Sequence, residues 1–307
     1  GERARLKGYI INKFRGEIGL FDGALDVIAE KTGLDCLGIV PYFPEASLLP
    51  AEDAVALDHA GGERARPDAG TVTIAVPRLP RIANFDDLDP LAAEEAVTVE
   101  IVEAGRALPG EADLILLPGS KSALADLAFL KREGWDIDIL AHARRGGMVV
   151  GLCAGYQMLG RRIADPDGVE GPAGEVPGLG LLEVETVLGG TKTLREVHGR
   201  DVVTGAPVTG YEMHMGVTRG PGCERPMLDL DGRPDGARSA DGRILGCYLH
   251  GLFAADGFRR AFLSRLREGL GDGVAYETQV EETLDKLADH LAAALDLDAQ
   301  AVKSFLL

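Results

Sequence analysis

A cysteine at position 153 lies where an apolar run meets a glycine-rich turn. The residues around it are G-L-C-A-G-Y-Q-M-L-G, and Met148, Val149 and Val150 precede them. This pattern predicts a buried strand that leads into a short helix, with Gly155 allowing the sharp turn and the sulfur exposed at the bend. Backbone N–H groups at the first turn of a helix favour a thiolate. We therefore expect Cys153 to have a lowered pKa and to act as a nucleophile.

A cysteine nucleophile needs a base that removes its proton and later protonates the leaving group. His250 ends an apolar, strand-like run, I-L-G-C-Y-L-H-G-L-F. Because active sites of α/β proteins gather at strand ends, we predict that His250 is this base. His214, in G-Y-E-M-H-M-G, is equally compatible with a core position or with a wall of the substrate site. The remaining histidines lie in a linker, in amphipathic helices or in a polar turn, where structural roles are expected.

A third candidate element is the segment L-L-P-G-S at 116–120. It predicts a strand that ends in a Pro-Gly turn, whose backbone N–H groups point at the space above the sheet edge. Together with the N–H of Ala154, such a turn could hold the oxyanion of a tetrahedral intermediate. An ordinary turn is the alternative interpretation.

Strands and helices alternate around these residues. The patterns predict strands at 71–76, 97–102 and 113–117, and helices at 85–95, 122–131 and 136–145. This alternation indicates an α/β fold with a mostly parallel sheet that is covered on both faces. Residues 180–249 predict an antiparallel extension, and helical spacing returns at 257–267 and 277–295.

The N-terminal segment is predicted to belong to a different domain. A strand at 6–12, a helix at 18–31 and a strand at 36–40 form a βαβ fragment that cannot bury its own sheet, so we expect the remnant of a larger domain. We divide the chain into this remnant (1–58), a Gly-rich and charged linker (59–70), the main domain (71–262) and a helical C-terminal extension (263–307).

Composition narrows the function classes. The formal charge of −17 over 307 residues disfavours nucleic acid and anionic membranes as partners. No apolar run reaches the roughly 18 residues that span a bilayer, and the first residues lack the apolar core of a signal peptide, so we predict a cytoplasmic location. The four cysteines are widely spaced, which predicts neither a disulfide framework nor a metal site.

The three candidate segments resemble a known family. G-L-C-A-G-Y-Q-M-L-G is similar to the G-x-C-x-G-x-Q elbow of triad-type (class I) glutamine amidotransferases, L-L-P-G-S to their oxyanion loop and Y-L-H-G-L-F to their histidine strand. Further segments resemble the cobyrinic and cobyric branch, above all the cobyric acid synthases of cobalamin biosynthesis: I-I-N-K-F-R-G, L-P-R-I-A-N-F-D-D-L-D-P-L, L-L-P-G-S-K-S-A-L-A-D-L and G-Y-E-M-H-M-G. The resemblance implies a flavodoxin-like sheet in the main domain and an ATP-dependent synthetase as the source of the N-terminal remnant.

The resemblance also implies the roles of single residues. Cys153 would attack the side-chain amide of glutamine and form a γ-glutamyl thioester, while His250 helps ammonia leave. Gln157 would contact the glutamine substrate, with a helix-surface position as the alternative, and Gly119 and Ala154 would donate to the oxyanion.

The implied reaction uses this ammonia to amidate a corrinoid, converting adenosylcobyrinic acid a,c-diamide into cobyric acid. ATP and magnesium are expected on the synthetase portion and no cofactor on this chain, which has no G-x-x-x-x-G-K-[ST] loop. Only Asn12 and Lys13 suggest the adenine-recognising end of a synthetase.

Two positions depart from the wider family. Leu252 stands where most members have a glutamate, which leaves His250 without an obvious orienting carboxylate, and Glu212 and Asp256 are the candidates to replace it. Ala154 stands where glycine is common. Alternative functions are a related glutaminase that serves cobyrinic acid or a peptidoglycan precursor, and a non-catalytic sensor built on the same cysteine elbow.

Overall fold

The computed structural model describes residues 6–50, 70–190, 193–271 and 273–295. The chain divides into two compact units, one formed by residues 1–50 with 277–307 and the other by residues 51–276. None of the described helices is long and apolar enough to cross a lipid bilayer.

The first unit contains a small parallel sheet. Strands β1 (Gly8–Phe14) and β2 (Asp35–Pro41) pair in parallel, and helix α1 (Asp22–Thr32) lies between them in the sequence. This arrangement confirms the predicted βαβ fragment. Two 3-10 turns complete this part, η2 (Ile18–Phe21) and η3 (Pro44–Leu48).

Helix α8 (Tyr276–Ala294) belongs to the first unit from residue 277 onward. Its end packs on β2, where Gly38 bridges Leu295, and a Cβ at Gly38 would lie 2.2 Å from the carbonyl oxygen of Ala294. His290 Nε2 donates a hydrogen bond to the carbonyl of Pro41 at 2.9 Å. The prediction of a separate helical extension at 263–307 is therefore wrong. Helix α8 belongs to the first unit from residue 277 onward, while α7 (Asp256–Leu266) belongs to the second. Residues 59–69 of the predicted linker lie outside the described residues.

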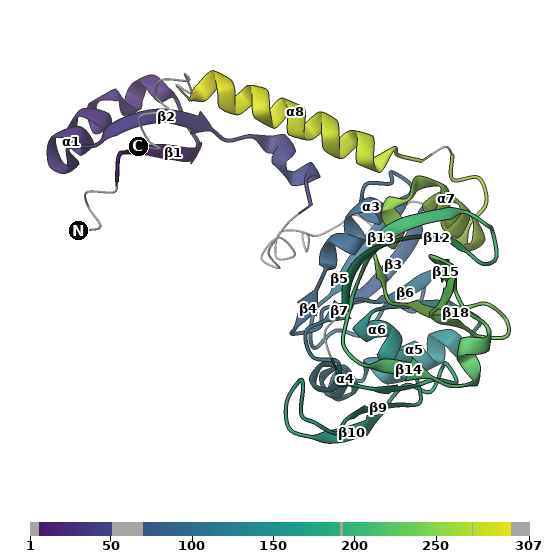
Figure 1. The fold of residues 1–307 in the computed structure, drawn as a ribbon. Coiled ribbons are helices and arrows are strands. Elements are labelled where there is room, and N and C mark those ends of the chain that lie inside the picture. The colour runs from purple at the N-terminus through teal and green to yellow at the C-terminus, as the bar shows by residue number, and fades with distance from the viewer. Residues whose placement is uncertain (1–5, 51–69, 191–192, 272, 296–307) are drawn as a thin grey trace. The chain divides into compact units, whose positions relative to one another are not determined.

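A six-stranded sheet forms the centre of the second unit, in the order β17-β18-β8-β6-β3-β5 (Figure 1). Its strands are β3 (Val72–Pro77), β5 (Val97–Val102), β6 (Leu114–Leu117), β8 (Met148–Leu152), β17 (Ala237–Arg238) and β18 (Ile244–Cys247). All neighbouring strands are parallel except β17 with β18. Every residue of β3, β6, β8 and β18 is buried, as expected for a parallel sheet that is covered on both faces. The predicted α/β fold is confirmed.

Helices surround this sheet at the predicted places. They are α4 (Ala123–Arg132), α5 (Trp135–Arg144), α6 (Ala154–Leu159) and α7. The helix predicted at 85–95 is shorter than expected: it consists of a 3-10 turn, η4 (Phe85–Leu88), and one turn of α-helix, α3 (Asp89–Ala92).

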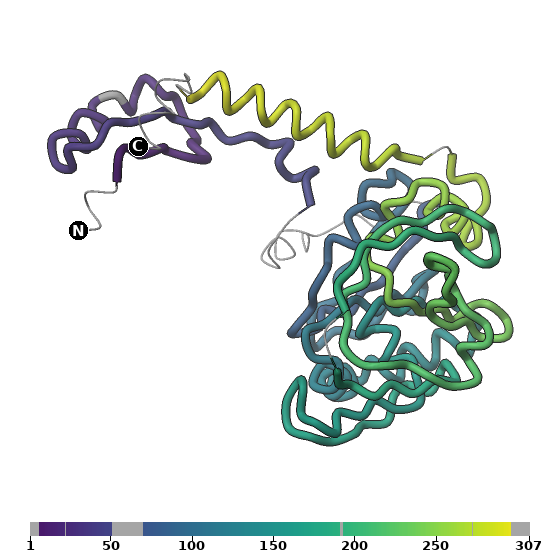
Figure 2. The backbone as a smooth tube through the Cα atoms, viewed as in Figure 1, coloured from purple at the N-terminus to yellow at the C-terminus, as the bar shows by residue number. Residues whose placement is uncertain are grey.

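Two antiparallel or mixed sheets make up most of the predicted extension. The five-stranded sheet has the order β16-β15-β12-β13-β19, with β12 (Thr193–Asp201), β13 (Pro207–His214), β15 (Leu228–Leu230), β16 (Arg233–Asp235) and β19 (Leu249–His250). Figure 2 shows β12 and β13 as a long, curved pair in green.

The four-stranded sheet has the order β10-β9-β11-β14, with β9 (Arg162–Asp165), β10 (Gly174–Pro177), β11 (Glu185–Val187) and β14 (Val217–Arg219). Shorter elements are β4 (Ile82–Ala83), β7 (Gly119–Ser120), η5 (Pro221–Glu224) and η6 (Leu252–Ala254).

Candidate active site

Cys153 occupies a strained bend between β8 and α6. Its φ of 51° and ψ of −108° place a non-glycine residue in a sparsely populated backbone region. Such strain costs about 1 to 3 kcal/mol and is typical of functional sites, including strand-to-helix nucleophile elbows. The prediction of an exposed sulfur is wrong, because Cys153 is only 8% exposed. The thiol nevertheless has a polar neighbour, since Sγ donates to the carbonyl of Met213 at 3.4 Å.

Three glycines let α6 lie very close to the sheet. A Cβ at Gly155 would lie 2.1 Å from the carbonyl oxygen of Leu117 on β6, and one at Gly151 would lie 2.5 Å from the Gly155 backbone. A Cβ at Gly246 on β18 would lie 2.3 Å from the ring of Tyr156. The role predicted for Gly155, a sharp turn, is therefore wrong: Gly155 is required for close approach, while Cys153 itself adopts the unusual conformation.

His250 is brought to the elbow by the neighbouring strand. β18 pairs with β8, and the N–H of Cys153 donates to the carbonyl of Cys247 at 2.8 Å. The chain then continues into β19, where His250 is 1% exposed. The structure thus brings Cys153 and His250 together, as the sequence predicts.

The carboxylate that orients His250 is Asp87. Its Oδ2 lies 2.7 Å from His250 Nδ1, and its Oδ1 accepts the N–H of Gly251 at 2.6 Å. Because the carboxylate accepts a hydrogen bond from the N–H of Nδ1, the neutral ring keeps its basic lone pair on Nε2. Nε2 is buried and has no hydrogen-bond partner among the described residues.

The two carboxylates predicted for this role are both engaged elsewhere. Glu212 pairs with Arg195 and Arg233, and Asp256 pairs with Arg259 at 2.8 Å. The prediction of Glu212 and Asp256 is therefore wrong. Sequence reasoning missed Asp87 although its segment, F-D-D-L-D-P-L, stood out, and the available signal was an acidic pair shortly after a buried strand of the sheet.

The charges around His250 favour its protonated form. Burial lowers its pKa, but the hydrogen bond to Asp87 and the interaction with the Cys153 sulfur outweigh burial and raise the pKa to about 10. The site can therefore hold an imidazolium beside the sulfur, which is the charge state that a cysteine nucleophile requires.

Tyr211 covers the imidazole on one side. Its ring stacks on His250 with centroids 5.3 Å apart and an interplanar angle of 26°. The side-chain amide of Asn84 donates to the Tyr211 hydroxyl. Asn84 directly precedes η4, so the same short segment supports both the Asp87 contact and this ring.

Gly119 lies next to His250, and Ala154 follows Cys153 in the chain. A Cβ at Gly119 would lie 3.1 Å from His250 Cε1 and 2.9 Å from the carbonyl oxygen of Ala83. Ala154 is the first residue of α6, where N–H groups have no partner within the helix. One of the two predicted oxyanion donors is therefore close to His250 and the other is adjacent to Cys153.

Gln157 points into the protein. It is 3% exposed, so the alternative of a helix-surface residue is wrong. Its Nε2 donates to the carbonyl of Met215 and to the hydroxyl of Tyr248, each at 3.3 Å. The ring of His214 stacks on that of Tyr248 with centroids 3.9 Å apart. Burial lowers the pKa of His214. His214 thus belongs to the wall that Gln157 also contacts.

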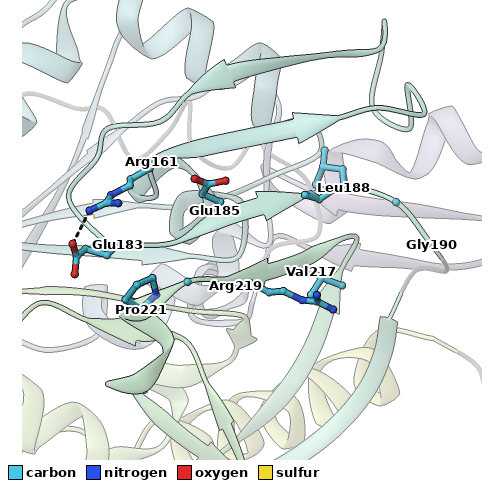
Figure 3. A pocket seen from close by; sticks show the side chains of 11 residues that line it. Arg161, Glu183, Glu185, Leu188, Gly190, Val217, Arg219 and Pro221 are labelled. Atoms are coloured by element: carbon cyan, nitrogen blue, oxygen red, sulfur yellow. Dashed lines mark hydrogen bonds and ion pairs between the residues drawn. The ribbon is translucent and has the colours of Figure 1, made fainter.

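A separate groove of about 640 Å³ lies on β11 and β14 (Figure 3). Val187 and Val217 are among its apolar residues, and Arg161 and Glu183 form an ion pair at 2.6 Å on its rim. Neither Cys153 nor His250 lines it, so this groove is not the site of the reaction at the elbow.

Comparison with known proteins agrees with this geometry. Residues 73–258 match the model of the CobB/CobQ-like glutamine amidotransferase domain. The chain is 53% identical over 296 residues to cobyric acid synthase of Cereibacter sphaeroides, covering 96% of this chain and 60% of that protein. It is 55% identical over 298 residues to cobyric acid synthase of Ruegeria sp., covering 97% of this chain and 60% of that protein. The chain thus spans about 60% of the length of these curated relatives.

Among solved structures, PurLQS from Thermotoga maritima is similar with a TM-score of 0.45 and 18% identity, covering 70% of this chain and 99% of that chain. This likeness is too low to support an assignment. The family model matches more than half of the chain, residues 73–258, and this match shows the family. The chain belongs to the CobB/CobQ-like glutamine amidotransferase family.

Proposed function

We propose that the second unit hydrolyses glutamine and supplies ammonia for the amidation of a corrinoid carboxylate. The observation that carries this proposal is the series Asp87, His250 and Cys153, in which a buried carboxylate orients a histidine beside a cysteine on a strained elbow. A sensor without catalysis would need neither the orienting carboxylate nor a histidine with a raised pKa.

The proposed reaction has two halves. His250 takes the thiol proton, and the sulfur attacks the side-chain amide carbon of glutamine. Backbone N–H groups of Gly119 and Ala154 hold the oxyanion that forms. The intermediate then expels ammonia, which receives its proton from His250, and a γ-glutamyl thioester remains.

In the second half, His250 accepts a proton from water, whose oxygen attacks the thioester. Collapse of this intermediate releases glutamate, and His250 returns the proton to the departing sulfur, which restores the thiol. Gln157 is proposed to contact the bound glutamine, because its amide lies in the buried wall next to the elbow.

The acceptor is inferred from the relatives named cobyric acid synthase. We propose adenosylcobyrinic acid a,c-diamide as the acceptor and cobyric acid as the product. A carboxylate must be activated before ammonia can attack it, so ATP and magnesium are expected on a synthetase portion. Asn12 and Lys13 are exposed on β1, and Asn12 Oδ1 accepts the N–H of Lys13 at 2.8 Å.

Glutamate release tests the reaction at the elbow. Wild-type chain is incubated with glutamine, and Cys153→Ala is compared with Cys36→Ala, which removes a thiol of the first unit. We expect Cys153→Ala to abolish glutamate release and Cys36→Ala to retain it. Release that survives in Cys153→Ala contradicts the proposal, as does labelling of a different cysteine by a glutamine-like chloroketone.

Amidation tests the acceptor. In a protein with a complete synthetase portion, Cys153→Ala is expected to lose glutamine-dependent formation of cobyric acid and to keep ammonia-dependent formation. Mass spectrometry of the corrinoid product distinguishes this outcome from amidation of cobyrinic acid or of a peptidoglycan precursor.

A further inference from the structure

We propose that Asp126 is a positioning residue that keeps the oxyanion loop in register with the segment that carries Asp87. Asp126 lies on α4 and is 0% exposed. Its Oδ2 accepts the backbone N–H of Arg81 at 3.0 Å and the hydroxyl of Ser120 at 2.7 Å. Its Oδ1 accepts from Arg81 Nη1 at 3.2 Å. The inference rests on the proposed function, because the oxyanion loop matters only if an oxyanion forms.

This carboxylate joins two segments that are far apart in the sequence. Arg81 begins the stretch that leads through β4 and η4 to Asp87, and Ser120 ends β7, which contains Gly119. β4 and β7 pair in antiparallel fashion, and the N–H of Lys121 donates to the carbonyl of Arg81 at 2.9 Å. Asp126 therefore binds the residue that precedes β4 and the last residue of β7.

The pair needs this support because each of its strands has two residues. A two-stranded ribbon is marginally stable even at greater length, so the ladder alone fixes its register weakly. The hydroxyl of Ser120 also accepts the N–H of Ser122 at 3.0 Å, which closes the loop on itself at the start of α4. Asp126 thus holds the β4 side of the pair through the backbone and side chain of Arg81, and the β7 side through the hydroxyl of Ser120.

Register matters here because the contacts at Gly119 are tight. A Cβ at this position would meet both the Ala83 carbonyl and the His250 ring, so the loop has almost no free space in this direction. An oxyanion donor acts only when it lies within hydrogen-bond distance of the developing charge, and small displacements are costly in rate. Losing the Asp126 contacts should therefore impair the transition state more than glutamine binding.

The direct test compares Asp126→Asn with Glu94→Gln. An asparagine must turn its amide NH₂ group toward donors that the carboxylate accepted from, so at least one contact is lost. Glu94 is a matched control, since it is also buried and accepts from an arginine, Arg259 Nε at 2.6 Å, and from a backbone N–H, that of Val274. Both variants are expected to lower the melting temperature.

The kinetic readout separates the two roles. For Asp126→Asn we expect kcat for glutamate release to fall about 10- to 100-fold with KM within about twofold, because a displaced donor weakens transition-state binding. Glu94→Gln should keep kcat within about twofold. An Asp126→Asn enzyme whose kcat equals that of the control, or whose KM alone rises, overturns the proposal.

Hydrogen exchange gives a readout that does not depend on turnover. The backbone amides of residues 119–122 should exchange at least tenfold faster in Asp126→Asn than in the wild type, and at the wild-type rate in Glu94→Gln. If the wild type released no glutamate, the proposed function would fail, whereas the positioning role would still be decided by exchange at this loop. Should Asp126→Asn not fold, Ser120→Ala replaces it: faster exchange of the amides of residues 119–122 supports the proposal, and exchange at the wild-type rate overturns it.

Discussion

Asp87 and His250 form a hydrogen-bonded pair across 163 positions of the chain, with Oδ2 and Nδ1 2.7 Å apart. The second oxygen of the same carboxylate accepts the N–H of Gly251 at 2.6 Å, so Asp87 fixes both the imidazole and the backbone next to it. Leu252, at the position where a family glutamate is expected, is fully buried in the core. The orienting carboxylate is therefore supplied by the 3-10 turn η4.

Replacing Asp87 by asparagine should disable the base. The amide can still accept from Gly251, but it then presents NH₂ to Nδ1 and favours the tautomer with its proton on Nε2. We expect kcat for glutamate release to fall by about 10²- to 10⁴-fold. Asp86→Asn, a change at the adjacent half-buried carboxylate, is the control and should retain activity within about threefold. Equal losses in the two variants would assign the effect to local charge rather than to orientation.

The pH dependence of stability should report the charge on His250. Its pKa of about 10 in the folded protein lies above the ordinary value of 6.5. The protonated histidine therefore contributes stability that is fully present below pH 6.5 and is lost as the pH rises toward 10. Urea unfolding of wild type and His250→Gln between these limits should show a wild-type advantage that shrinks with rising pH. A difference independent of pH would contradict this assignment.

The close packing of α6 predicts a severe effect of a single methyl group. In Gly155→Ala, the new Cβ would lie 2.1 Å from the Leu117 carbonyl oxygen, and neither backbone can move without shifting β6 or the elbow. We expect a loss of about 1 to 3 kcal/mol or more in the free energy of unfolding, together with loss of glutamate release. Gly257→Ala in α7, where nothing lies within 4 Å of the added Cβ, should be neutral or slightly stabilising. Thermal unfolding of both variants checks this difference.

Glu212 should prove structural rather than catalytic. It is 3% exposed and pairs with Arg195 and Arg233, whose side chains are partly exposed. Glu212→Gln is expected to cost about 1 to 2 kcal/mol of stability while kcat stays within about threefold. A kcat loss as large as that of Asp87→Asn would return Glu212 to the catalytic group.

The sequence was sufficient to predict the order of the main elements and the two residues that meet at the elbow. Apolar runs identified the strands of the parallel sheet, and Cys153 and His250 each stand at the end of such a run. These are local patterns, and the carboxyl ends of neighbouring parallel strands meet at one edge. β8 and β18 are such neighbours, and His250 lies three residues after β18, on the short strand β19, so the rule places it near Cys153.

Asp87 could not be chosen on the same grounds. Asp86, Asp87 and Asp89 all lie in one short acidic segment, and which carboxylate reaches the imidazole depends on the turn of η4 and on the pairing of β4 with β7. The assignment of α8 to the first unit is similar, since its contacts with β2 join the two ends of the chain. Long-range packing of this kind leaves no periodic signal in the sequence.

The glycines beneath the elbow have a consequence for how the site can adjust. Gly151, Gly155 and Gly246 leave no spare volume between α6 and the sheet, so Cys153 cannot move toward the sheet. The opposite wall is different, because Met213 and Tyr211 lie on β13 of the antiparallel sheet. We expect that room for an incoming amide is made on this side, by release of the thiol from the Met213 carbonyl, while the sulfur itself stays in place.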